Sequence, residues 1–219
     1  MADKPDDVMF SPAVKAEQTR LGSRAMFENR EWKTEITDDM RQFLAVIDTF
    51  FFATASADGR PYIQHRGGPP GFLKPIGTHM LAFADFAGNR QYITLGHLKE
   101  NDRAHIFILH FATRQRVKLW GRARIVEGDL ALMERLADPS YKARPERAIV
   151  FTLEAWDINC PQHIQPRYTE AEIAPAVDRL AQRIKELEEE VARLKSTPRR
   201  AQYSPSRRAC TSPVAQSLS

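Results

Sequence analysis

Residues 49–66 have the sequence TFFFATASADGRPYIQHR, in which two apolar runs flank an Asp-Gly pair. The first run, residues 49–57, is rich in aromatic and small apolar residues, which is typical of a buried strand. Asp58-Gly59 is a strong signal for a tight turn between antiparallel strands. The segment therefore predicts a β-hairpin whose returning strand covers residues 60–66.

Further short strands are predicted along the chain on both sides of a loop. Residues 67–71, GGPPG, form that loop, because no regular element accommodates so much glycine and proline. We expect strands at residues 72–75, 80–85, 104–111, 117–126 and 148–158, and helices at 89–101 and 129–138. A doubly wound parallel sheet would need a helix after nearly every strand. The pattern instead predicts a mainly β fold, a small antiparallel β-barrel with flanking helices.

A helix is also expected just before the hairpin. Thr37 is predicted to cap its N-terminus, since acidic residues fill the first turn and apolar residues then recur at helical spacing up to Asp48. Residues 1–36 are polar with scattered apolar positions, which indicates a leader with short helices. We expect the barrel domain to cover residues 37–170.

The C-terminal part follows a different pattern. Apolar residues alternate at spacings of four and three: Leu180, Ile184, Leu187, Val191 and Leu194. This predicts an amphipathic helix over residues 171–195, which either forms a coiled coil or docks on its own domain. The repeat spans only two heptads, so both alternatives stay open. Residues 196–219, rich in Ser, Pro and Arg, are expected to form a disordered basic tail.

Composition limits the classes of partner. The 219 residues are 42% hydrophobic, which is enough for a sizeable core. The net charge of +4 comes from four tail arginines; without them, basic residues equal the 28 acidic ones, so no nucleic-acid partner is expected. No apolar run approaches the roughly 20 residues of a membrane helix, so we expect a cytoplasmic protein without a membrane partner.

Motifs for catalysis by protein groups alone are absent from the sequence, including G-x-S-x-G, H-E-x-x-H, C-x-x-C and G-x-x-x-x-G-K-[ST]. The six histidines show no metal-binding spacing; His105 and His110 point to opposite faces of their strand. Cys160 and Cys210 lie far apart in the sequence, and two cysteines make neither a disulfide framework nor a tetrahedral metal site. Cys160 would be a nucleophile only if His163 or Arg167 lowered its pKa, and a lone cysteine is more often inert. No metal is predicted, and the catalytic residues stay unknown.

Polar residues gather at the ends of apolar strands. Residues 64–74, QHRGGPPGFLK, place Arg66 and Lys74 around a glycine-rich turn. Residues 83–91, FADFAGNRQ, run from a strand into a helix whose first N–H groups would be free, with Arg90 beside them. Lys74, Arg90 and that helix start either hold a phosphate or are solvated strand ends.

Two more segments carry candidate residues. In residues 114–124, one face of the strand collects four cations and a tryptophan: Arg116, Lys118, Trp120, Arg122 and Arg124. Such a face suits an anionic partner, and it also suits a solvated outer face. Residues 156–168, WDINCPQHIQPRY, are too irregular for a strand and unusually rich in reactive side chains for a linker.

Together these segments resemble the flavin-binding split-barrel proteins related to pyridoxamine 5′-phosphate oxidase. The resemblance covers roughly residues 40–170. It is carried by FFATASADGRPYIQHRGGPPGFLK (51–74), LAFADFAGNRQYITLGHLKENDRA (81–104) and RVKLWGRARIV (116–126). It implies a homodimer of FMN-binding split β-barrels with two FMN molecules in the interface.

The resemblance also implies which residues contact the flavin. Lys74 ends the first contacting strand, residues 84–85 line the flavin, and residues 89–91 match a phosphate-binding segment. Arg116 matches a glutamine that reaches the flavin from the partner subunit, and Lys118 shares its face. A cation there would stabilise the reduced, anionic flavin. The candidate cofactor-binding residues are Arg66, Lys74, Ala84, Asp85, Asn89, Arg90, Gln91, Arg116 and Lys118.

The chain departs from the family oxidase in three places. Pro69 stands where the family has an arginine, for which Arg66 would compensate, and Gln91 stands where it has a lysine. Residues 156–168 do not reproduce the family's substrate-phosphate motif, so pyridoxamine phosphate is not the expected substrate. We expect this segment to shape a different substrate pocket, through Trp156, His163 and Arg167.

Three hypotheses about function follow. The first is an FMN-dependent oxidoreductase that exchanges hydride with a small-molecule substrate, with O₂ or a nicotinamide as the other redox partner. The second is a non-catalytic protein that binds flavin, deazaflavin or haem. The third is an interaction protein that assembles through its C-terminal helix and tail.

Overall fold

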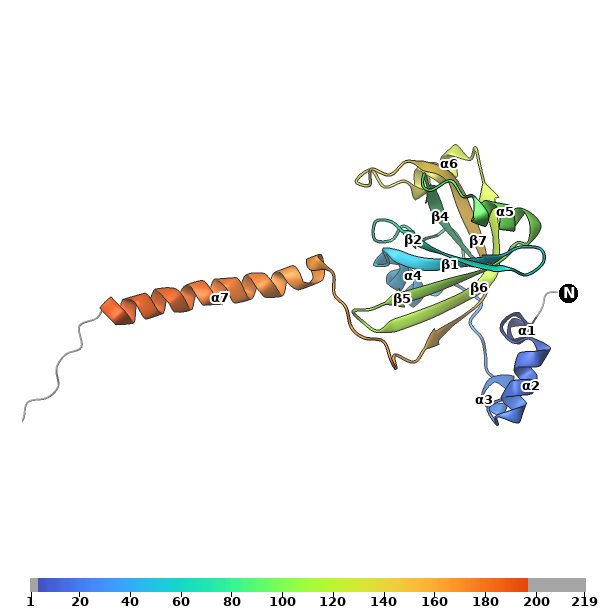
Figure 1. The fold of residues 1–219 in the computed structure, drawn as a ribbon, viewed down its shortest axis with the longest axis horizontal. Coiled ribbons are helices and arrows are strands. Elements are labelled where there is room, and N and C mark those ends of the chain that lie inside the picture. The colour runs from blue at the N-terminus through green and yellow to red at the C-terminus, as the bar shows by residue number, and fades with distance from the viewer. Residues whose placement is uncertain (1–3, 197–219) are drawn as a thin grey trace, which may run out of the picture. The chain divides into compact units, whose positions relative to one another are not determined.

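The computed structural model of the chain describes residues 4–196 (Figure 1). The strands are β1 (Thr49–Ala55), β2 (Pro61–Gly67), β3 (Lys74–Pro75), β4 (Met80–Phe86), β5 (Arg103–His110), β6 (Gln115–Val126) and β7 (Pro145–Asn159). The helices are α1 (Pro5–Met9), α2 (Pro12–Arg20), α3 (Ala25–Glu28), α4 (Asp38–Ala45), α5 (Ile93–Glu100), α6 (Leu130–Leu136) and α7 (Glu170–Ser196). The chain divides into two compact units, the first ending at Arg167 and the second beginning at Tyr168.

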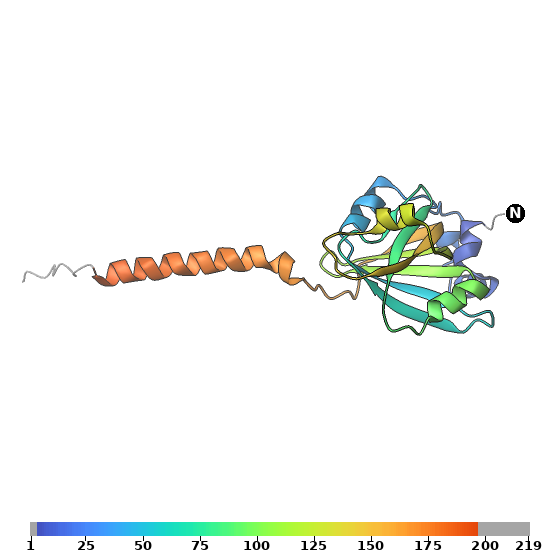
Figure 2. The same ribbon diagram turned by 90° about the horizontal axis from the view of Figure 1, so that it is seen from above.

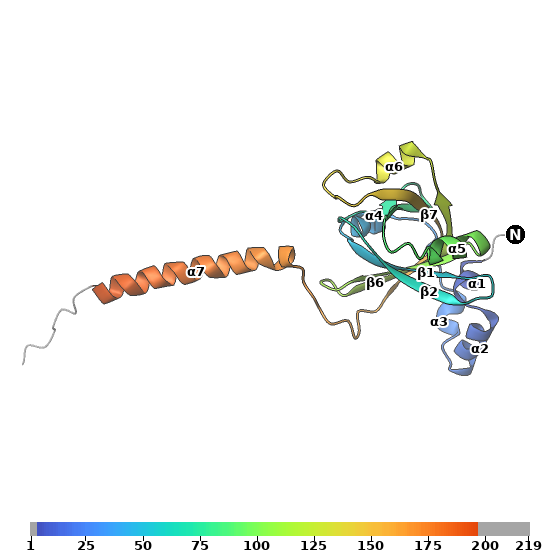
Figure 3. The same ribbon diagram turned by 45° about the horizontal axis from the view of Figure 1, so that its top comes forward.

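The first unit is built on one antiparallel sheet with the strand order β2-β1-β5-β6-β7-β4-β3. The sheet curls so far that β1 and β4, which are not neighbours in it, face each other across the interior (Figures 2 and 3). The ring centroids of Phe50 on β1 and Phe83 on β4 lie 5.1 Å apart, and Phe52 lies 5.6 Å from Phe83. The predicted mainly β, antiparallel barrel is thereby confirmed.

The barrel interior is apolar because alternate residues of each strand point inward. β1 alternates between half-buried and buried positions, and β6 does the same up to Ala123. Helix α4 adds Met40 and Leu44 to this core, and the Thr37 hydroxyl accepts a hydrogen bond from the Met40 N–H (3.3 Å), as predicted for its cap. Helix α6 covers a second, smaller cluster on the other face of β4.

The N-terminal leader contains three short helices beside the barrel. Phe10, Phe27 and Trp32 form an aromatic cluster with ring centroids 5.4–6.3 Å apart. Arg24 forms an ion pair with Asp6 at 2.7 Å. Arg24, together with Lys15, holds the pKa of Asp6 below its usual value. Tertiary contacts rather than helix length therefore order this segment.

Three sequence predictions are corrected in detail. The helix predicted from Asn89 starts at Ile93, because Arg90 and Tyr92 adopt positive φ angles of 57° and 54° that break the helical path. The spacing of Tyr92, Leu95 and Leu98 predicts one apolar face for this helix, but Tyr92 is exposed, and the buried residues of α5 are Thr94 and Leu98. The strand predicted at 72–75 shrinks to Lys74–Pro75, since the residues before it form a turn.

The second unit contains α7, whose start has the two reciprocal bonds of a capping box. The Thr169 hydroxyl accepts from the Glu172 N–H at 3.3 Å, and the Glu172 carboxylate accepts from the Thr169 N–H at 2.7 Å. No residue of α7 is buried. Apart from Ser196, the predicted tail lies outside the described residues.

Candidate functional site

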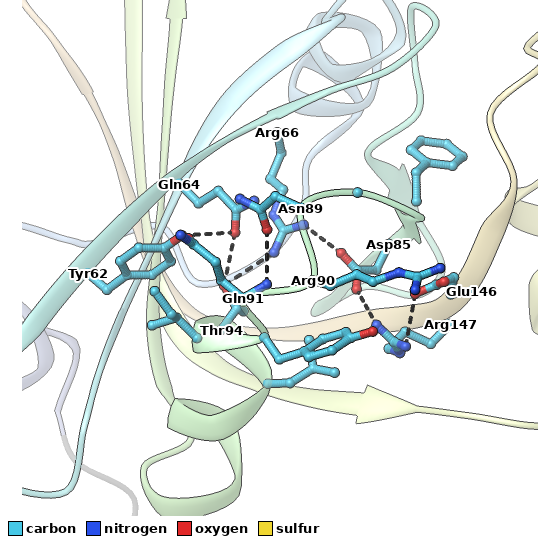
Figure 4. Close-up of a pocket in the computed structure, with 15 residues that line it drawn as sticks. Tyr62, Gln64, Arg66, Asp85, Asn89, Arg90, Gln91, Thr94, Glu146 and Arg147 are labelled. Atoms are coloured by element: carbon cyan, nitrogen blue, oxygen red, sulfur yellow. Dashed lines mark hydrogen bonds and ion pairs between the residues drawn. The ribbon is translucent and has the colours of Figure 1, made fainter.

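A polar pocket opens where the ends of β2 and β4 meet the loop that leads into α5 (Figure 4). Five of the predicted cofactor-binding residues line it: Arg66, Asp85, Asn89, Arg90 and Gln91. The lining also includes Tyr62, Gln64, Thr94, Glu146 and Arg147. Three arginines face two carboxylates there, so the ionised lining carries one net positive charge.

The β2 side of the pocket follows from strand geometry. Tyr62, Gln64 and Arg66 are separated by two residues each, so they lie on the same face of β2, and all three are half-buried. The Thr94 hydroxyl donates to the Gln64 amide oxygen at 3.3 Å and accepts from Arg66 at 3.2 Å. This chain of bonds ties β2 to the first turn of α5.

Asp85 is the centre of the pocket's charge network. One carboxylate oxygen accepts from Arg66 at 2.5 Å and the other from Arg147 at 2.9 Å, and Figure 4 shows the two guanidinium groups approaching it from two sides. The three side chains are only 8–13% exposed. Although burial lowers the pKa of Arg147, the bond and charge of Asp85, helped by Glu146, raise it above its usual value.

Two cationic groups in this pocket have hydrogen-bonding capacity to spare. The Nε of Arg66 is buried without a hydrogen-bond partner among the described residues. Arg90 has no hydrogen bond or ion pair from its side chain within residues 4–196, and its positive φ places it on the loop at the pocket edge. A buried N–H without a partner is costly, so the arrangement suits an oxygen-rich anion such as a phosphate.

Backbone groups next to these arginines also favour the binding of an anion. The N-cap of α5 is Tyr92 in the left-handed region, and it makes no side-chain capping bond. The Asn89 side chain accepts from the Gln91 N–H at 3.2 Å, which fixes the loop before the helix. The first N–H groups of α5, close in sequence to Arg90, thus have no capping side chain.

Lys74 and Ala84 lie in a different hollow from this pocket. They face a cavity that is also lined by Pro69 and Asp138 and closed by α6. Ala84 is on the opposite face of β4 from Asp85, because neighbouring strand residues point to opposite sides. Within one copy of the chain, the structure therefore does not bring Lys74 together with Arg90.

Arg116 and Lys118 lie on the outward face of β6, as the alternation predicted. An Arg116 N–H donates to the Cys160 carbonyl at 3.2 Å, while its Nε is buried without a partner in the described chain. The Lys118 ammonium lies 5.1 Å from the Trp120 ring, and burial lowers its pKa against an opposing effect of Asp157. This face is thus aromatic and half-buried as well as cationic.

The three residues expected to shape a substrate pocket are not gathered at one place. Trp156 is 2% exposed and donates to the Glu35 carbonyl at 2.7 Å, which places it in the core. His163 is exposed with a φ of 62°. Arg167 is exposed and stacks over Phe111 at 4.7 Å. None of them lines the Asp85 pocket.

Sequence reasoning missed five polar members of the pocket: Tyr62, Gln64, Thr94, Glu146 and Arg147. The first two were open to prediction, because they precede Arg66 at a period of two in the same strand. Arg147 was not, since only the pairing of β4 with β7 places it opposite Asp85. Among residues 4–196 there is no cluster of metal-ligating side chains and no helix long and apolar enough to cross a membrane.

The sequence model of a family described as pyridoxamine 5′-phosphate oxidase matches residues 36–160, more than half of the chain. No curated protein sequence matches the chain. Among solved structures, HupZ of Group A Streptococcus has 15% identity and a TM-score of 0.46, over 61% of this chain and 99% of that one.

Two further solved structures are similarly remote. A Clostridium acetobutylicum protein related to general stress protein 26 has 17% identity and a TM-score of 0.44, over 62% of this chain and 94% of that one. An FMN-binding protein of Syntrophomonas wolfei has 14% identity and a TM-score of 0.43, over 68% of this chain and 95% of that one.

Proposed function

Since the chain belongs to the pyridoxamine 5′-phosphate oxidase family, we propose that it is an FMN-dependent oxidoreductase that acts on a small molecule. The observation that carries the proposal is the pair of arginines with spare donors in the Asp85 pocket. Arg66 has a buried Nε without a partner in the described chain, and Arg90 makes no side-chain bond there. A phosphate in this pocket would offer acceptor oxygens to these arginines.

The residues of the pocket divide the work of holding such a ligand. Arg66, Arg90 and the first N–H groups of α5 bind the phosphate, and Asn89 and Gln91 shape the loop around it. Asp85 fixes the Arg66 guanidinium before any ligand arrives, so little ordering is left for the binding step. Bound FMN supplies hydride transfer, which none of the protein's own groups provides.

We propose further that two copies of the chain complete the site. Phe51, Phe107 and Trp120 are half-buried on the outward face of β1, β5 and β6, and the ring centroids of Phe51 and Phe107 are 6.5 Å apart. An aromatic face of this kind suits a protein partner. A second copy on it would supply Arg116 and Lys118 to the flavin of the first, as the family resemblance implies.

The alternative is a protein that binds flavin, deazaflavin or haem without turnover. One observation favours it: the expected substrate residues Trp156, His163 and Arg167 do not form a pocket together. Under this alternative the protein takes up ligand but its bound flavin is not bleached by substrates or by a nicotinamide. Anaerobic bleaching assays on the flavin-loaded protein separate the two functions.

The phosphate contact is tested by comparing FMN with riboflavin, which lacks the phosphate. Arg90→Gln removes one charge-assisted contact worth about 1.5–3 kcal/mol, so FMN should bind roughly 10–100-fold more weakly. Riboflavin affinity should not change. Arg60→Gln is the matched control, because Arg60 is 84% exposed in the β1–β2 loop. An equal loss for both flavins, or no FMN uptake by the unaltered protein, contradicts the proposal.

A further inference from the structure

The apolar seam of α7 is longer than the sequence repeat alone indicated. The helix begins at Glu170, so Ile173 and Val177 extend the alternating spacing of four and three. The seam then consists of Ile173, Val177, Leu180, Ile184, Leu187, Val191 and Leu194, which are 42–65% exposed. We propose that α7 pairs with α7 of a second copy of this chain as a parallel, two-stranded coiled coil.

The residue types along the seam specify the number of strands. In heptad notation the a positions are Val177, Ile184 and Val191, and the d positions from the second turn on are Leu180, Leu187 and Leu194. β-Branched residues at a with leucine at d favour two-stranded, parallel coils. Ile184, Leu187 and Val191 also border a hollow on the helix surface, the kind of hole into which a facing side chain inserts.

Charges beside the seam favour the parallel orientation. In a parallel pair, a g residue faces the e residue five positions further along the partner helix. Arg183 at g then faces the partner's Glu188, and Glu190 at g faces the partner's Lys195, so both contacts join opposite charges. An antiparallel pair opposes g to g and e to e, so that Arg183 faces the partner's Glu190 but the contacts with Glu188 and Lys195 are lost. The parallel pair therefore joins more opposite charges.

Contacts inside one helix do not compete strongly with this pairing. Arg183 bridges Glu186 at 3.0 Å, and Glu190 lies 3.9 Å from Arg193, but these pairs are largely exposed and such pairs contribute little. Pro175 falls at the outward f position near the start of α7, and six of the seven seam residues follow it. The pairing therefore requires only that exposed side chains change rotamers.

Disulfide cross-linking of the full chain tests the parallel register. With Cys160 and Cys210 replaced by serine, Leu194→Cys and Leu180→Cys each place one thiol on the seam. Both variants should form disulfide-linked dimers under mild oxidation, because equivalent residues meet in a parallel coil. Gln182→Cys, at the outward f position, is the matched control and should stay unlinked. The proposal is overturned if neither seam variant forms a disulfide-linked dimer, as expected if α7 docks on its own domain. It is also overturned if Gln182→Cys is linked as efficiently as the seam variants.

A charge swap tests the partner contacts. In the Leu194→Cys background, Arg183→Glu places a glutamate opposite the partner's Glu188 and should reduce the linked fraction. Adding Glu188→Arg should restore it. Lys185→Glu makes the same charge change at the outward b position and should have no effect. The parallel assignment is contradicted if Lys185→Glu reduces the linked fraction as much as Arg183→Glu does. The two-stranded assignment is contradicted if sedimentation gives a mass above two chains.

This inference stands apart from the flavin proposal. The seam variants should take up FMN as well as the unaltered chain, because no seam residue lines the Asp85 pocket. Intact cross-linking without FMN uptake would refute the proposed function alone. Normal FMN uptake without cross-linking would refute the coiled coil alone.

Discussion

Replacing Asp85 with asparagine should destabilise the barrel far more than the same change at an exposed ion pair. The Asp85 carboxylate is 8% exposed and neutralises two arginines that are themselves 12% and 13% exposed. The asparagine side chain would keep the size of the aspartate but leave Arg66 without its carboxylate partner, and Arg147 would keep only Glu146 and Glu127. Removing one member of a buried charge network costs about 3–5 kcal/mol. For a chain of this length, that corresponds to a melting temperature lower by roughly 6–20 °C.

Asp102→Asn is the internal reference for this experiment. Asp102 also pairs with an arginine, Arg122, at 2.8 Å, but the two side chains are 52% and 42% exposed. An exposed pair contributes about 0–1 kcal/mol and is screened by salt. Urea unfolding of both variants at low and high salt measures the difference. The reasoning is refuted if Asp85→Asn costs less than about 1 kcal/mol, or if its cost falls with salt as much as that of Asp102→Asn.

The remaining predictions concern pH and backbone packing. Burial, with a smaller contribution of Lys118, lowers the pKa of His105 to about 4. Stability should therefore fall as the pH drops from 6.5 towards 4. In urea unfolding, this decline should be weaker for His105→Gln than for the exposed His79→Gln. Gly121→Ala should unfold at a lower temperature, since its Cβ would overlap the Thr152 carbonyl oxygen. Gly96→Ala should gain roughly 0.5–1 kcal/mol, because nothing lies within 4 Å of that Cβ and alanine favours a helix.

The strands were predictable because apolar or alternating runs of residues are bounded by turn residues. The hairpin around Asp58-Gly59 appears with Ala55 paired to Pro61, although its loop is longer than a two-residue turn. The start of α5 was not predictable, because nothing in the composition of residues 89–92 signals that Arg90 and Tyr92 adopt positive φ angles. Local patterns thus give the strands, whereas the loop conformation that shapes the pocket depends on tertiary contacts.

The candidate site shows the same division between local and distant information. Arg66, Asp85 and Arg90 were singled out because cations and turn residues follow apolar strands, and the structure brings all three to one pocket. Lys74 pairs with Ala82, which lies on the same face of β4 as Ala84 and on the opposite face from Asp85. The alternation along β4 could be read from the sequence, but the register of β3 against β4 could not. Arg147 enters only through the pairing of β7 with β4, which no local pattern encodes.

The strand number of α7 bears on whether both proposals hold in one molecule. The proposed barrel interface is isologous, so it closes at two copies. A helix that preferred three or four strands would recruit chains from different barrel pairs and link them into an open network. β-Branched residues at a and leucines at d favour two strands instead. The proposed barrel pair would raise the effective concentration of the two seams, which offsets the short length of the coil.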